Sequence, residues 1–200
     1  MKTTSMKTTW SVLRVVCAAS FLVRPAEAEK WKIDPARSSA RFSVRHLMVE
    51  NVTGGFTRVS GTIDLDGRDV TRSGIEAVID ATTIDTRDDD RDRHLRSADF
   101  FDVKKFPRIR FVSTSIRPAG PDRLTVVGNL TIRSATRSVT LDVRTSPEKN
   151  DGSGKRRSAT ATGTIDRKDF GIVWNQVLDS GGVAVGDEVA ITLSIEASPA

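Results

Sequence analysis

Apolar and polar residues alternate one by one along most of the chain. This two-residue period is typical of a β-strand with one apolar face and one polar face. It recurs at residues 40–47, 59–65, 74–83, 108–116, 123–132, 138–143, 158–166 and 189–197. Turn-forming residues separate several of these stretches, at residues 53–55 (TGG), 66–69, 118–122 and 150–154. The pattern therefore predicts eight strands in an antiparallel meander, which closes into a barrel or folds into a sandwich to hide its edges.

Many positions on the predicted inward face are small. They are Ala40, Gly61, Ala77, Ala81, Gly128, Ala159, Ala161 and Gly163. An eight-stranded barrel is just wide enough either to be filled by side chains or to hold one small ligand. Small inward residues favour a cavity, whereas Phe42, Phe111 and Trp174 favour a filled interior. The residues alone leave both open.

One helix is predicted, within residues 86–101 (TRDDDRDRHLRSADFF). Three aspartates, residues 88–90, stand where it begins and arginines follow, which suits both N-capping and the helix dipole. At about 100° per residue, one face carries Arg91, His94, Leu95 and Ala98. The opposite, solvent-facing side carries Asp89, Arg93 and Arg96. The inner face thus combines an apolar anchor with a cation and an imidazole.

The first residues have the layout of a secretory signal peptide. Basic residues precede an apolar run at residues 15–23, and residues 26–28 (AEA) place small residues where a signal peptidase reads them. The run is shorter than the roughly 20 residues that span a bilayer. We expect residues 1–28 to be cleaved and residues 29–200 to form a single exported domain.

That cleavage changes the composition. The chain has a net charge of +5, of which +3 lies in residues 1–28, so residues 29–200 carry only +2. Their charges are interspersed, with residues 155–157 (KRR) as the one short basic cluster, which argues against nucleic-acid binding. The sole cysteine, Cys17, also lies in the predicted signal peptide. Disulfides and thiolate metal sites are therefore excluded from the remainder, and no metal-ligand spacing is visible.

Four motifs together resemble the YceI-like family. They are residues 31–56 (WKIDPARSSARFSVRHLMVENVTGGF), 91–111, 128–143 and 167–197. The resemblance implies a periplasmic, lipocalin-like barrel with a long apolar tunnel that binds a polyisoprenoid or related amphipathic lipid. The predicted fold class is accordingly all-β: an eight-stranded antiparallel up-and-down barrel, with one short helix covering its mouth. No cofactor is expected beyond a bound lipid, which is a polyisoprenoid, a quinone or a fatty amide.

Nine residues are candidates for ligand contact: Phe42, His46, Arg91, His94, Leu95, Phe100, Phe101, Phe111 and Trp174. Several have a structural alternative. His46 is alternatively a buried, hydrogen-bonded histidine of the core, Phe100 and Phe101 are core anchors, and Trp174 plugs the barrel end.

Arg91 and His94 are interpreted as polar contacts at the cavity mouth, because the planar fork of an arginine suits a phosphate head group. Their alternative is a structural network with Asp99 or Asp102. A less favoured hypothesis is a barrel hydrolase that uses His94 with Asp99 as general base. It lacks a serine or cysteine nucleophile in a recognisable context, so no catalytic or metal-binding residue is assigned.

The expected partner is a hydrophobic small-molecule lipid. The alternative function is that of an accessory protein that presents a quinone-like lipid to a membrane protein in electron transfer. A closed barrel needs no partner for its stability, and the chain is expected to be a monomer or a homodimer.

Overall fold

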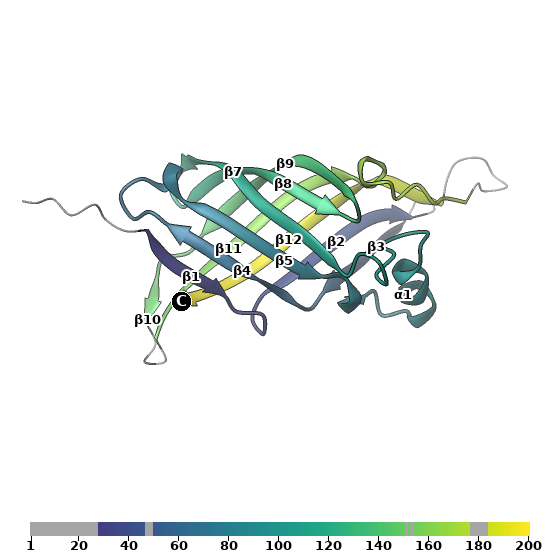
Figure 1. Cartoon of the computed structure of the whole chain (residues 1–200), viewed down its shortest axis with the longest axis horizontal. Helices are drawn as coiled ribbons and strands as arrows, with labels where there is room; N and C mark the ends of the chain where they lie inside the picture. Colours follow the sequence, from purple (N-terminus) through teal and green to yellow (C-terminus); the bar gives the residue numbers. More distant parts are fainter. Residues whose placement is uncertain (1–27, 47–49, 151, 153, 177–183) are drawn as a thin grey trace, which may run out of the picture.

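The computed structural model describes residues 28–46, 50–150, 152, 154–176 and 184–200. Strands dominate this part of the chain (Figure 1). They are β1 (Glu29–Ile33), β2 (Ser39–His46), β3 (Glu50–Phe56), β4 (Val59–Leu65), β5 (Gly74–Asp80), β6 (Ile84–Asp85), β7 (Arg108–Gly120), β8 (Arg123–Ile132), β9 (Ala135–Thr145), β10 (Lys149–Asn150), β11 (Lys155–Asp166) and β12 (Val185–Pro199). The helical segments are α1 (Asp89–Arg96) and the short 3-10 helices η1 (Val70–Arg72), η2 (Ala81–Thr83) and η3 (Arg167–Phe170). The predicted signal peptide, residues 1–28, lies outside the described residues except for Ala28, so its cleavage stays a prediction.

The strands close into a single antiparallel barrel. β4, β5, β7, β8, β9 and β11 are neighbours in that order, and β12 completes the ring by pairing with β11 on one edge and with both β1 and β2 on the other. β1 and β2 follow one another along β12, and β4 and β3 lie beside them in the same way. Each of these two pairs acts as one bent strand, so the ring is an eight-stranded meander, and the predicted fold class is confirmed.

The eight predicted strands are all present, but one predicted turn is wrong. Residues 53–55 lie inside β3, which pairs with β2. A Cβ atom on Gly54 would lie 2.5 Å from the ring of Phe42, its partner across the two strands. Glycine is therefore present at this position to admit an aromatic ring and not to turn the chain.

The small inward residues shape the interior in two ways. Glycines receive large side chains from neighbouring strands: a Cβ on Gly128 would lie 2.4 Å from the Phe111 ring, and one on Gly163 would lie 2.9 Å from Leu141. Alanines such as Ala40 and Ala161 are buried but fill little volume. The barrel is consequently packed in part and hollow in part.

The barrel end away from α1 is filled by Trp31 and Arg157. Trp31 is 1% exposed, and the guanidinium carbon of Arg157 lies 5.1 Å from the centre of its ring. Both residues lie on the inward faces of their strands, two positions from Ile33 and Ala159. Glu148 accepts a hydrogen bond of 2.9 Å from Arg157 and compensates its charge. These two side chains therefore occupy part of the interior at this end.

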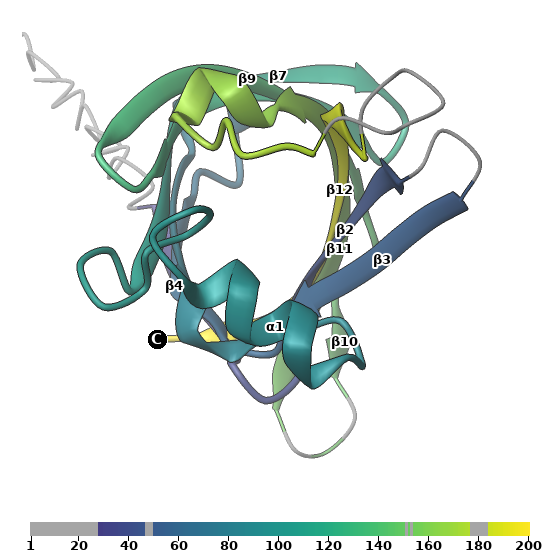
Figure 2. The same ribbon diagram turned by 90° about the vertical axis from the view of Figure 1, so that its right-hand side faces the viewer.

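The opposite end, which we call the mouth, is surrounded by α1, η3, the end of β2 and the beginning of β12. Figure 2 looks into the barrel from this end, with the teal α1 and the yellow-green segment of η3 on different sides of the ring. Asp88 caps α1 by accepting a hydrogen bond of 3.0 Å from the backbone N–H of Arg91. Acidic residues in the first turn and basic residues in the last turn complement the helix dipole.

The predicted faces of this helix need two corrections. α1 ends at Arg96, so Ala98 lies beyond it and is exposed. Arg96 does not point into solvent: it is half-buried and donates hydrogen bonds to the carbonyl oxygens of Thr82 and Ile84. The short helix is thus attached to the barrel wall through its own last residue.

Replacement of Gly128 by alanine is expected to destabilise the barrel by about 1–3 kcal/mol, because the new methyl group would overlap the Phe111 ring. Gly74→Ala is the matched control on β5, since nothing lies within 4 Å of the added Cβ. Urea denaturation of the two variants measures the difference. Equal free energies of unfolding would show that the Phe111 ring moves aside without cost.

Candidate functional site

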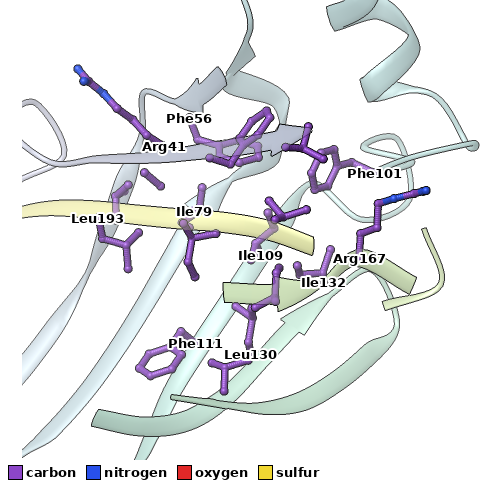
Figure 3. Close-up of a pocket in the computed structure, with 18 of the residues that line it drawn as sticks. Arg41, Phe56, Ile79, Phe101, Ile109, Phe111, Leu130, Ile132, Arg167 and Leu193 are labelled. Carbon is purple, nitrogen blue, oxygen red and sulfur yellow. The ribbon is translucent and has the colours of Figure 1, made fainter. Parts of the chain in front are cut away.

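A cavity of about 550 Å³ occupies the barrel interior next to the mouth. Its wall is made almost entirely of aliphatic and aromatic side chains, and Figure 3 shows several of them, including Ile79, Ile109 and Leu130, around the open space. Pockets for small molecules usually measure roughly 300–1,000 Å³. The volume and the apolar lining suit one elongated hydrophobic molecule.

All nine candidate residues lie on the wall of this one cavity. They are Phe42, His46, Arg91, His94, Leu95, Phe100, Phe101, Phe111 and Trp174. Residues that are far apart in the sequence, on β2, α1, β7 and the segment after η3, are therefore brought together. Contact between any of them and a ligand stays a prediction.

Five of the candidates belong to two clusters of rings on the cavity wall. In the first, the His94 ring meets Trp174 edge-on at 4.7 Å and Phe100 at 5.0 Å between ring centres. In the second, Phe56 stands between Phe42 at 6.0 Å and Phe101 at 5.5 Å. Phe100 is buried and belongs to the packed core, yet it also lines the cavity. Core packing and cavity lining are therefore not alternatives for these side chains.

Arg91 is held by the loop before its own helix. Its Nε donates a hydrogen bond to the Thr86 hydroxyl at 2.8 Å, and its Nη2 donates one to the Thr86 carbonyl oxygen at 2.9 Å. Asp92, which is 5% exposed, accepts hydrogen bonds from the backbone N–H and hydroxyl of Thr86 at 2.9 and 2.6 Å. Nη1 of Arg91 lies 3.6 Å from Asp88. A backbone hydrogen bond from Arg91, with the nearby positive charge of that residue, lowers the pKa of Asp88, which therefore stays ionised at neutral pH.

His94 is also held from within the protein. Its Nε2 lies 3.0 Å from Oδ2 of Asp99, both side chains being partly exposed at the mouth. The expected alternative network with Asp99 is thus present for His94, whereas Arg91 bonds elsewhere. Asp102 is buried and lies 3.5 Å from Lys105, away from both candidates. His46 is half-buried at the end of β2, where it lines the cavity opposite Val185.

Arg167 is the strongest polar feature of the mouth, and sequence reasoning missed it. The residue is 4% exposed, and its guanidinium donates five hydrogen bonds. The acceptors are the carbonyl oxygens of Gly186 (2.8 Å), Ile172 (2.9 Å), Trp174 (2.7 Å) and Val185 (3.2 Å), and Oδ1 of Asp187 (3.1 Å). A guanidinium has five N–H donors, so every one is used. Arg167 thereby fastens the segment that carries Trp174 to the beginning of β12.

Asp187 compensates the buried charge of Arg167. Lys168 donates a hydrogen bond of 2.7 Å to Oδ2 of Asp187, and the positive charges of Lys168 and Arg167 both lie close to the Asp187 carboxylate. The hydrogen bond from Lys168, followed by these charges, lowers the pKa of Asp187, so the carboxylate is ionised at neutral pH. A signal for Arg167 exists in the sequence, because it continues the inward positions of β11 after Gly163 and Ile165. No comparable signal marks Asp92 or Thr86.

The described residues contain no group of three or more histidine, cysteine, aspartate or glutamate side chains placed to hold a metal ion. None of the helices found in that same part of the chain is long and apolar enough to cross a membrane.

A closed antiparallel barrel with a helix at its mouth and an apolar interior cavity defines a lipocalin-like protein. The chain belongs to the YceI-like family, since the family model of the YceI-like domain matches residues 31–197. It is 37% identical over 167 residues to a UPF0312 protein of Staphylococcus aureus strain MSSA476. The aligned region covers 82% of this chain and 95% of the relative. A UPF0312 protein of Staphylococcus epidermidis is 37% identical over 171 residues, or 84% of this chain and 97% of the relative.

Solved structures agree with this assignment. BcnA of Burkholderia cenocepacia superposes with a TM-score of 0.72 at 25% sequence identity, over 83% of this chain and 99% of that one. A polyisoprenoid binding domain from Saccharophagus degradans, implicated in plant cell wall breakdown, superposes with a TM-score of 0.63 at 16% identity, over 85% and 98% of the two chains. The second likeness establishes a shared fold.

Replacement of Arg167 by methionine is expected to reduce the free energy of unfolding by about 3 kcal/mol, because buried carbonyl oxygens lose their donors. Arg144→Met, at an exposed position of β9, is the control and should change stability by no more than about 0.5 kcal/mol. Chemical denaturation followed by circular dichroism checks both. If Arg167→Met unfolds at the same denaturant concentration as the control, the hydrogen bonds of Arg167 add nothing to stability.

Proposed function

We propose that the protein binds and carries an elongated apolar lipid, of the polyisoprenoid or a similar amphipathic class, inside the barrel. The observation that supports this most strongly is the cavity of about 550 Å³ with its almost entirely apolar wall. Each methylene group buried there contributes roughly 0.8 kcal/mol. A long hydrocarbon chain would therefore bind through the wall alone, without specific polar contacts along its length.

The family supports the same function. The related barrel from Saccharophagus degradans is described as a polyisoprenoid binding domain, and its fold is shared by this chain. In our proposal the nine candidate residues contact the ligand, with Phe42 and Phe111 along the chain of the lipid and the remaining candidates nearer the mouth. A binding role suits a cavity in which Arg91, His94 and Arg167 are already bonded to the protein.

We infer further that residues 1–28 are a signal peptide and that the protein acts in the periplasm. A carrier in that compartment would shield a water-insoluble lipid from solvent between membranes. Presentation of a quinone-like lipid to a membrane protein is a more specific form of the same function. It differs from simple transport only in the identity of the acceptor.

The protein, expressed with its signal peptide and recovered from the periplasm, is expected to retain a lipid. Its mass under native conditions should exceed that of the chain and fall to the bare chain on denaturation. Mass spectrometry of the released molecule then identifies its class. Repeated recovery of an unliganded chain under native conditions would contradict a tightly binding carrier.

A variant tests whether the cavity is the binding site. Ala161 on β11 lines the cavity, and its neighbour Thr160 points outward and is exposed. Ala161→Phe is expected to abolish lipid retention because the added ring occupies the cavity, whereas Thr160→Phe should retain it. Lipid retained by Ala161→Phe at the same level as by Thr160→Phe would place the binding site outside the barrel.

A further inference from the structure

The polar side chains at the mouth determine which head group a bound lipid can carry. An inference about this head group rests on the proposed lipid-binding function and concerns the same cavity. Besides its apolar wall, the cavity is bordered by Arg41, His46, Asp90, Arg91, His94 and Arg167. An anionic head group requires at least one cation among these whose charge and donors are available.

Arg167 offers neither an uncompensated charge nor a free hydrogen-bond donor. All five of its N–H donors are used within the protein, and Asp187 compensates its charge. Arg41 contributes only the base of its side chain, because its guanidinium points away from the apolar side chains of the cavity (Figure 3). A phosphate would have to break existing hydrogen bonds to bind Arg167, and the guanidinium of Arg41 does not face the cavity.

Arg91 is the remaining arginine, and its surroundings are acidic. Two of its nitrogen atoms donate to Thr86, and the third lies 3.6 Å from Asp88. The phosphate role expected for Arg91 from the sequence is therefore not supported by its contacts. α1 and its cap carry four carboxylates, at residues 88, 89, 90 and 92, against three arginines, at residues 91, 93 and 96. A phosphate beside Arg91 would also lie beside these carboxylates.

Two other charged groups that border the cavity are paired as well. The Asp90 carboxylate accepts a hydrogen bond of 2.7 Å from Arg93. The Nε2 atom of His94 lies 3.0 Å from Oδ2 of Asp99. Among the described residues on the cavity border, Arg91 and Arg167 thus each lie beside a carboxylate that compensates their charge, and Asp90 lies beside Arg93.

We propose that the mouth selects a lipid with an uncharged head group that both donates and accepts hydrogen bonds, such as a hydroxyl or an amide. Such a group can accept from the hydrogen on Nη1 of Arg91 and donate to a carboxylate oxygen of Asp90 without separating any existing ion pair. A phosphate or an ammonium group would lose its hydration and gain no uncompensated partner, which is costly in a partly desolvated site.

Four lipids with the same hexadecyl chain test this selection. Hexadecan-1-ol, hexadecanamide, hexadecyl phosphate and hexadecylamine are allowed to displace the uncharged dye N-phenyl-1-naphthylamine from the purified protein at neutral pH. The alcohol and the amide are expected to bind about ten-fold or more tightly than the phosphate and the amine. Because the chain is constant, the ratio of dissociation constants reports the head group alone.

Two variants test the electrostatic cause. Asp88→Asn keeps an N-capping side chain and Asp90→Asn keeps its size, and each removes one negative charge beside Arg91. Both are expected to tighten hexadecyl phosphate binding several-fold. Asp88→Asn should leave hexadecan-1-ol binding unchanged, whereas Asp90→Asn should weaken it, because an amide oxygen is a weaker acceptor for the hydroxyl than a carboxylate oxygen. Asp64→Asn removes an exposed carboxylate that lies 3.7 Å from Lys30 on the outer surface of the barrel, and it should change neither constant.

The outcomes separate the two proposals. Hexadecyl phosphate that binds as tightly as hexadecan-1-ol would overturn the head-group selection while leaving lipid binding intact. The same conclusion follows if the asparagine variants behave like Asp64→Asn. If none of the four lipids displaces the dye, the lipid-binding function itself fails, and the head-group selection fails with it.

Discussion

The closure of eight antiparallel strands into a ring fixes the width of the interior, and the sizes of the inward side chains decide what that interior can hold. Phe111 and Leu141 extend across glycines on neighbouring strands, whereas Ala40 and Ala161 leave volume free. The cavity therefore arises from the distribution of side-chain volume around an intact hydrogen-bonded ring. Its apolar character follows from the strand period, because every second residue of an amphipathic strand faces the same side.

The buried and half-buried arginines at the mouth hold neighbouring segments of the barrel together. Arg167 holds the segment after η3 against β12, Arg91 holds the loop before α1, and Arg96 attaches the end of α1 to β6. Arginine suits this work because its rigid fork satisfies several carbonyl oxygens at once and remains charged at any physiological pH. The cost of burying the charge of Arg167 is offset by Asp187, on the adjoining strand. A ligand consequently meets a rim on which Arg91 and Arg167 already bind other parts of the protein.

The sequence predicted the strands, the helix and cavity-lining residues such as Phe42, Phe111 and Leu95 because all of these depend on periodicity. Alternation identifies which residues face inward, and the spacing of Arg91, His94 and Leu95 identifies the inner face of α1. The partners of each polar side chain depend on loops that periodicity does not describe. The bond between Arg91 and Thr86 and the five bonds of Arg167 follow from where the chain turns. The turn predicted at residues 53–55 was wrong for a related reason. A glycine that makes room for the Phe42 ring cannot be told from the sequence alone from a glycine that forms a turn.

The strand β12 has a consequence for the order in which the chain can fold. It is the last strand, yet it pairs with β11 and with β1 and β2 near the other end of the described chain. The ring therefore cannot close before β12 has paired with both of its neighbours, and a sheet without β12 has two unpaired edges, which can pair with other chains. The contacts between β12 and the first strands have a long sequence separation, and such contacts form slowly. Closure of the ring thus depends on the pairing that joins the two ends of the described barrel.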